Sequence, residues 1–115
     1  MNAFPTTVCN SAVIPAQGGP ILSELADDPD FRELVSLFVA LIPERRETLC
    51  RQFAQQDCAA LATTAHQLKG SGGGYGFPGL SAAAAELERA CKTGERELVA
   101  TTFEALLAYM DRISL

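Results

Sequence analysis

The sequence has little aromatic character and contains a single histidine. Of its 115 residues, six are phenylalanine, two are tyrosine and none is tryptophan. Alanine and leucine dominate from residue 31 onward, and these residues favour helices, whereas sheets are rich in β-branched and aromatic residues. The length and the 48% share of hydrophobic residues suit one ordinary domain. We therefore expect one all-α domain.

The sequence also lacks the signals of nucleic-acid and membrane partners. Fourteen acidic and nine basic residues give a formal charge of -5, a balance that disfavours nucleic acid. No apolar run approaches the roughly 20 residues of a membrane helix. The first ten residues have neither the basic start nor the apolar middle of a signal peptide. We expect a cytoplasmic protein that binds no nucleic acid and no membrane.

The four cysteines do not have the spacing of a metal site. No two of them are separated by the roughly two to four residues that are typical of zinc ligands. We expect small, packed thiols, and a disulfide framework is the alternative. The cysteines are Cys9, Cys50, Cys58 and Cys91.

The first part of the chain is irregular before it becomes helical. Residues 1–20 contain three prolines and no periodic apolar pattern, which predicts a flexible lead-in. A short helical turn is expected at residues 21–26. A helix is expected to begin near Pro29 and to break or kink at Pro43, because proline removes a backbone donor. Its inward stripe comprises Phe31, Leu34, Val35, Phe38, Leu41, Ile42, Leu49 and Phe53.

Three further helices are expected over residues 58–75, 78–92 and 95–113, where apolar residues recur at helical spacing. Asp57 can cap the first of them, and Gly94 can end the second. Short links make consecutive helices pack antiparallel, so residues 21–115 are expected to form an up-down four-helix bundle. The predicted core positions are Leu61, Ala65, Leu68, Gly72, Tyr75, Leu80, Ala84, Leu87, Cys91, Val99, Phe103, Leu106, Met110 and Ile113.

The single histidine, His66, faces away from this predicted core. At about 100° per residue, its side chain lies roughly 160° from the mean direction of the apolar positions. Each glycine inside a helix costs roughly 1 kcal/mol relative to alanine. Close helix packing can explain Gly72 and Gly74, whereas Gly70 and Gly73 indicate that another protein approaches the imidazole. The residues predicted to surround His66 are Ala59, Ala62, Lys69, Gly70 and Gly73.

The residues predicted to surround His66 favour phosphoryl chemistry. A neutral imidazole is a good nucleophile near neutral pH, and its sequence neighbours, Ala65 and Gln67, are not carboxylates. Lys69 lies one helical turn further and brings a positive charge within reach of an anion on His66. Phosphoryl transfer needs mainly positioning and charge stabilisation, and a partner can supply the metal. Formation of phosphohistidine is therefore the predicted reaction.

The stretch HQLKGSGGGYG, residues 66–76, resembles the HxLKGS...G signature of histidine-containing phosphotransfer (HPt) domains of bacterial two-component phosphorelays. The resemblance extends over about residues 21 to 113. It implies a four-helix bundle whose exposed histidine accepts a phosphoryl group from an aspartyl phosphate on one receiver domain and donates it to the aspartate of another. Such a chain is a covalent carrier without an ATP site of its own, and not an enzyme.

The resemblance also implies roles for single residues. His66 is the phosphoacceptor, Lys69 balances the phosphoryl charge and Gly70 lets the receiver approach. The expected docking residues are Ala62, Gln67, Gly70 and Gly73. The chain is expected to bind no cofactor, since Mg²⁺ belongs to the receiver domain.

Two alternatives remain open from the sequence. A non-transferring relative would dock on a kinase or receiver domain through the same face and inhibit it. A bundle that binds a metal or a small ligand is less favoured, because the chain has one histidine and no inward Glu-x-x-His pair. The expected partners are receiver domains of response regulators or hybrid sensor kinases, and the chain is expected to be a monomer.

Overall fold

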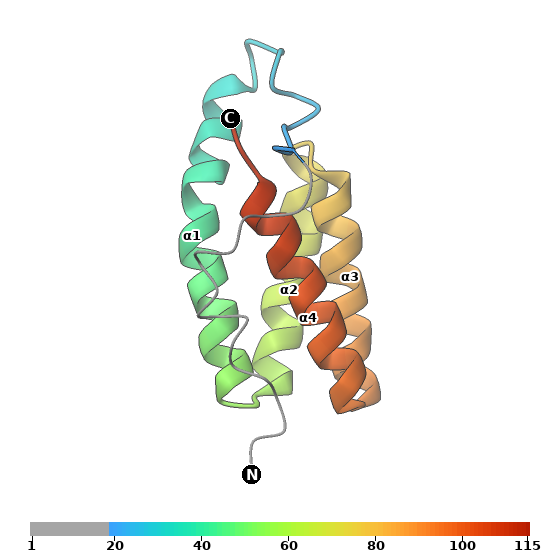
Figure 1. Cartoon of the computed structure of the whole chain (residues 1–115). Coiled ribbons are helices and arrows are strands. Elements are labelled where there is room, and N and C mark those ends of the chain that lie inside the picture. The colour runs from blue at the N-terminus through green and yellow to red at the C-terminus, as the bar shows by residue number, and fades with distance from the viewer. Residues whose placement is uncertain (1–18) are drawn as a thin grey trace.

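The computed structural model describes residues 19–115, which form an up-down bundle of four helices (Figure 1). Consecutive helices run in opposite directions, so the all-α bundle expected from the sequence is confirmed. Most of the predicted lead-in, residues 1–18, lies outside the described residues. The helices are α1 (Arg32–Ala54), α2 (Cys58–Gly74), α3 (Pro78–Thr93) and α4 (Arg96–Arg112).

The core lies along the axis between the helices and uses most of the predicted positions. Phe53 of α1 stacks on Phe103 of α4 with ring centroids 3.9 Å apart, and Phe38 of α1 stacks on Tyr75 at the end of α2. These ring contacts attach α1 to α2 and to α4. The other buried apolar residues include Val35, Ile42, Leu49, Leu61, Ala65, Leu68, Leu80, Ala84, Leu87, Val99, Leu106 and Met110.

Helix α1 differs from the prediction in two ways. It continues through Pro43 without the expected break; Pro43 is exposed, so its ring meets no neighbouring helix, and the helix loses one backbone hydrogen bond there. The inward stripe is also narrower than predicted. Phe31, Leu34 and Leu41 are exposed, because α1 meets the other helices only along the seam formed by Val35, Phe38 and the buried residues that follow them.

The segment before α1 closes one end of the bundle. The Ile21 amide donates a hydrogen bond to the Arg112 carbonyl (2.6 Å), and the Ser114 amide donates to the Ile21 carbonyl (2.9 Å). The expected helical turn at residues 21–26 is a hydrogen-bonded turn over residues 24–27 that does not continue into a helix. Pro29 lies in a second turn, and α1 begins at Arg32.

Local signals end and start the helices that carry the site. The Asp57 carboxylate accepts a hydrogen bond from the Ala60 amide (3.0 Å) and caps α2. Gly94 follows α3 in the left-handed conformation, with φ 74°. Both predicted boundaries are therefore confirmed. Among the helices of residues 19–115, none is long and apolar enough to cross a membrane.

Candidate functional site

His66 lies on the outer face of α2. Its side chain is 65% exposed, while Ala65 and Leu68 on the same helix are buried. The rotation of α2 about its axis is fixed by these core residues and by Thr64, whose hydroxyl donates a hydrogen bond to the Gln52 side-chain oxygen of α1 (2.9 Å). The outward orientation derived from helical periodicity is therefore present in the structure.

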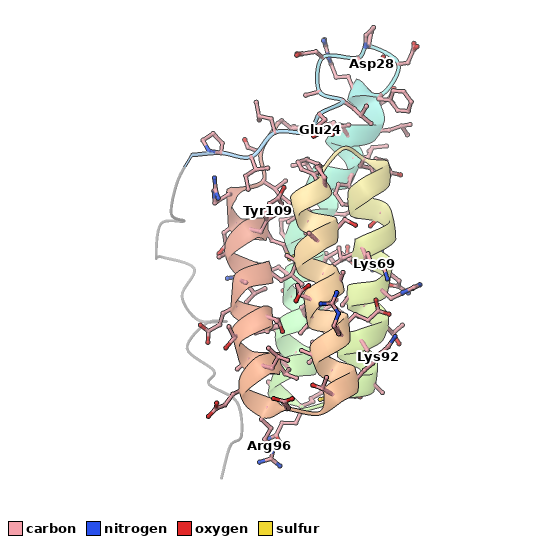
Figure 2. The ribbon with its side chains drawn as sticks, turned by 90° about the vertical axis from the view of Figure 1, so that its right-hand side faces the viewer. Glu24, Asp28, Lys69, Lys92, Arg96 and Tyr109 are labelled. Carbon is pink, nitrogen blue, oxygen red and sulfur yellow. The ribbon has the colours of Figure 1, made fainter. Side chains whose placement is uncertain are left out.

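A carboxylate from α3 lies against the histidine. Glu88 Oε2 is 3.0 Å from His66 Nδ1, and Glu88 Oε1 is 3.0 Å from Lys69 Nζ. Lys92 Nζ lies 3.5 Å from Oε2. Figure 2 shows Lys69 and Lys92 on the same side of the bundle, where α2 and α3 are neighbours. One carboxylate, only 12% exposed, thus holds the histidine and two lysines.

The charges around Glu88 keep it ionised. The hydrogen bond from Lys69 is the largest influence and lowers the pKa of Glu88 to about 2; desolvation acts in the opposite direction, and His66 and Lys92 lower the pKa further. An ionised carboxylate only accepts hydrogen bonds, so His66 Nδ1 carries the proton that is shared with Glu88. In the neutral imidazole, the lone pair is then on Nε2. Glu88 therefore leaves Nε2 as the ring nitrogen with the free lone pair in the neutral imidazole.

Glu88 was missed by the sequence analysis, which found no carboxylate beside His66. The two residues are 22 positions apart in the sequence, so inspection of the sequence neighbours could not find the pair. A signal was nevertheless available. Folding two antiparallel helices about the turn at residues 76–77 brings together positions that are about equally far from the turn, and His66 and Glu88 are such positions.

Two of the predicted docking residues adjoin the histidine directly. Ala62 and Gln67 line a shallow hollow of about 320 Å³ together with His66 and Glu88. Gln67 is exposed and Ala62 is half-buried. The imidazole therefore lies in a depression with one short side chain and one amide on its rim.

The glycines of α2 divide into packed and open positions. A Cβ atom on Gly72 would lie 3.1 Å from the Ser81 backbone nitrogen, so Gly72 permits the close packing of α2 on α3, as predicted. Gly70 and Gly74 have open space where a Cβ atom would lie, measured against the described residues. The packing explanation is therefore wrong for Gly74. Gly73 is exposed at the border with α3, where a Cβ atom would be 3.8 Å from Ser81 Oγ.

Other kinds of site receive less support from this structure. Within residues 19–115, no group of three or more histidine, cysteine, aspartate and glutamate side chains could hold a metal ion. A hollow of about 470 Å³ lies where the segment before α1, the start of α1 and the C-terminus meet. None of the residues around His66 lines it, so it has no part in the chemistry of the histidine.

Comparison with protein families gives one match. A family model described as Hpt domain matches residues 33–114, a range that contains α2, α3, α4 and almost all of α1. Comparisons with curated proteins and with solved structures gave no significant match.

Proposed function

This chain belongs to the Hpt domain family, and we propose that His66 receives a phosphoryl group from an aspartyl phosphate of one receiver domain and passes it to the aspartate of another. Hpt domains take part in histidine phosphotransfer in phosphorelays and interact with receiver domains. They are phosphocarriers and not catalysts with an ATP site. The observation that carries the proposal is the exposed imidazole whose Nδ1 is held by Glu88.

The chemical step follows from the selected nitrogen. Nε2 of His66 attacks the phosphorus atom, a P–N bond forms, and the P–O bond to the receiver aspartate breaks so that the aspartate leaves as a carboxylate. The imidazole gains positive charge while the P–N bond forms. The Glu88 carboxylate, 3.0 Å from Nδ1, stabilises that charge. Donation to the second receiver reverses the same step.

Lys69 is suited to balance the charge of the phosphoryl group. Its side chain is 40% exposed, and its ammonium contacts Glu88 Oε1 at 3.0 Å. Because an ammonium has three N–H donors, Lys69 can keep this contact and donate to a phosphoryl oxygen at the same time. The proposed role is therefore charge stabilisation of phosphorylated His66.

The receiver docks on the surface around His66 in this proposal. Gly70 and Gly73 present no side chain and Ala62 presents a methyl group, so a receiver domain can bring its aspartate close to Nε2. Gln67 offers an amide for hydrogen bonding at the rim. The Mg²⁺ ion needed for the transfer is held by the receiver and not by this chain.

The test is transfer from a receiver domain that carries a radiolabelled aspartyl phosphate. Label is expected on the wild-type chain and not on His66→Gln, and it should be lost in acid but survive base, as in phosphoramidates. Ser71→Ala is the matched control and should accept label normally. Tight binding of the receiver without label on the chain would favour a non-transferring inhibitor, and acid-stable label on Ser71 would contradict the proposal.

A further inference from the structure

Lys92, in the last turn of α3, borders the hollow that contains His66. Lys92 and Glu88 line this hollow of about 320 Å³ from α3, and His66 lines it from α2. The same two residues of α3 also line a second hollow of about 210 Å³, to which α2 contributes Lys69. Figure 2 shows both lysines on one side of the bundle. Lys92 therefore borders the space beside the imidazole, and Lys69 borders the neighbouring space.

Glu88 holds the two lysines to different degrees. Lys69 Nζ lies 3.0 Å from Oε1, and its hydrogen bond is the largest influence on the pKa of Glu88. Lys92 Nζ lies 3.5 Å from Oε2, and its side chain is 69% exposed. A charge-assisted hydrogen bond from nitrogen to a carboxylate oxygen is usually about 2.7–2.9 Å long, so Lys92 makes a loose ion pair. Its ammonium can therefore leave Glu88 at a lower cost than the ammonium of Lys69.

The charges at the site call for a second cation once His66 is phosphorylated. A phosphoryl group brings a charge of roughly −1.5 to −2 near neutral pH. The Glu88 carboxylate offsets the charge of Lys69, so these two residues together leave no net positive charge for the phosphoryl group. Among the described residues that line the hollow beside His66, Lys92 alone carries a fixed positive charge. Lys92 is therefore the cation that remains to balance the phosphoryl group.

We propose that Lys92 is a second cation of the phosphotransfer site: once the P–N bond at His66 has formed, its ammonium turns from Glu88 into the hollow and donates a hydrogen bond to a phosphoryl oxygen. Lys69 keeps its contact with Glu88 in the same state. Lys92 gives up no proton, so the bonds that form and break are those of the transfer itself. The place of this contact in a phosphorelay rests on the function proposed above, whereas the contact itself requires only that His66 carries a phosphoryl group.

The contact would stabilise phosphorylated His66 relative to the phosphorylated receiver. A cation beside the phosphoryl group favours its dianion over its monoanion and so lowers the pKa of that group. The charged residues that face the phosphoryl group are Glu88, Lys69 and Lys92. Removal of the Lys92 ammonium should therefore raise the pKa of the phosphoryl group. It should also shift the transfer equilibrium toward the receiver by about two- to fivefold, as expected for a charge pair in contact with solvent.

The first measurement uses the full chain phosphorylated with phosphoramidate, a small phosphoryl donor, so that no receiver is needed. In ³¹P NMR titrations, the midpoint of the phosphohistidine signal should lie at a higher pH in Lys92→Met than in the wild type. Lys92→Arg, which restores the charge, should return the midpoint toward the wild-type value. Arg89→Met is the matched control, because it removes a positive charge from the same helix that is paired with Glu86 at 2.7 Å, and it should leave the midpoint unchanged.

The second measurement is the equilibrium distribution of label between a receiver domain and the chain. We expect about two- to fivefold less label on Lys92→Met than on the wild type, and a wild-type distribution with Arg89→Met. Imidazole ¹⁵N spectra of unphosphorylated Lys92→Met should show the same tautomer of His66 as the wild type, since Lys69 still holds Glu88.

The outcomes separate the role of Lys92 from the function on which it rests. A wild-type midpoint in Lys92→Met, or an equal shift in Arg89→Met, would overturn the proposal. A changed tautomer of His66 in Lys92→Met would show that Lys92 acts by positioning Glu88, and it would contradict direct contact with the phosphoryl group. If phosphoramidate phosphorylates His66 and the receiver does not, the proposed function fails while the ³¹P titration still decides the role of Lys92. A chain that neither donor phosphorylates contradicts both proposals.

Discussion

The single residue with the largest influence on the site is Glu88. Its carboxylate contacts His66, Lys69 and Lys92, so it orients the imidazole and positions two cations with one group. Because it is ionised, it fixes the proton of the neutral imidazole on Nδ1 and leaves the free lone pair on Nε2. The tautomer of the neutral His66 imidazole is thus set by a residue on another helix.

Removal of the Glu88 carboxylate should slow phosphoryl transfer. We expect a transfer rate about ten- to hundredfold lower in Glu88→Ala, which is the effect of losing one charge-assisted hydrogen bond. The loss should be smaller in Glu88→Gln, because glutamine keeps a hydrogen-bond acceptor without the charge. Imidazole ¹⁵N spectra should show the Nδ1–H tautomer in the wild type and a mixture of tautomers in Glu88→Ala. Glu86→Ala is the control, since Glu86 pairs with Arg89 instead. Wild-type rate and tautomer in Glu88→Ala would refute this role.

A bulky side chain at Gly70 should obstruct the receiver without disturbing the fold. Gly70 and Gly74 are both exposed, and neither has a described atom near the place of a Cβ atom, so Gly70→Gln and Gly74→Gln are a matched pair. We expect the transfer rate to fall about tenfold in Gly70→Gln and not in Gly74→Gln, because Gly70 lies nearer to His66 along α2. A factor of ten corresponds to about 1.4 kcal/mol of lost docking or transition-state energy. Urea unfolding should show both variants at least as stable as the wild type, since glycine is a poor helix former. Unchanged transfer by Gly70→Gln would show that the open surface is not needed for docking.

At the scale of elements, the helices were predictable where the signal is local. The regular spacing of buried residues such as Leu61 and Leu68 gave α2, and Asp57 and Gly94 marked boundaries through their own backbone requirements. Pro43 shows the limit of this reasoning. A helix tolerates proline when the ring faces solvent and when tertiary contacts hold the helix before and after the proline. The local sequence pattern does not show whether either condition is met.

The same difference between local signals and contacts between helices explains which residues of the site were predictable. Helical periodicity placed His66 and Lys69 on the outer face of α2, because both belong to one helix. Glu88 reaches them only through the packing of α3, and the openness of Gly74 depends on how far α3 extends beside α2. Contacts between elements need the register of the bundle, which the sequence pattern leaves approximate.

Replacing Pro43 should show the cost of carrying a proline inside α1. Pro43→Ala restores one backbone N–H that can bond the carbonyl four residues earlier, and we expect the free energy of unfolding to rise by about 1–3 kcal/mol. Pro78→Ala is the control: Pro78 is the first residue of α3, where the missing N–H has no partner to lose, and this change should have little effect. Urea denaturation of both variants measures the difference. A less stable Pro43→Ala would argue against one continuous α1.

At the scale of the whole molecule, the site is also part of the contact between α2 and α3. These two helices pack more closely than any other pair in the bundle, and small residues on both make this possible. The Ser81 hydroxyl donates to the Lys69 carbonyl (2.7 Å) next to the position where Gly72 meets α3. Glu88 adds charged contacts across the same seam, so the group that orients His66 also contributes to the stability of the bundle.

This double role predicts how the stability of the bundle depends on pH. The pKa of Glu88 falls from its ordinary value of 4.5 to about 2 on folding, so the stabilisation by its carboxylate is complete above about pH 4.5 and is lost as the pH falls through about 2. The difference in free energy of unfolding between the wild type and Glu88→Gln should therefore be constant near neutral pH, shrink below about pH 4.5 and vanish near pH 2. Urea denaturation of both proteins across this range measures it, and the subtraction removes the contribution of the other carboxylates. In a Lys69→Met background the difference should be smaller and should vanish at a higher pH, because the cation that most lowers the folded-state pKa of Glu88 is gone. A difference that stays constant down to pH 2 would contradict the pairing.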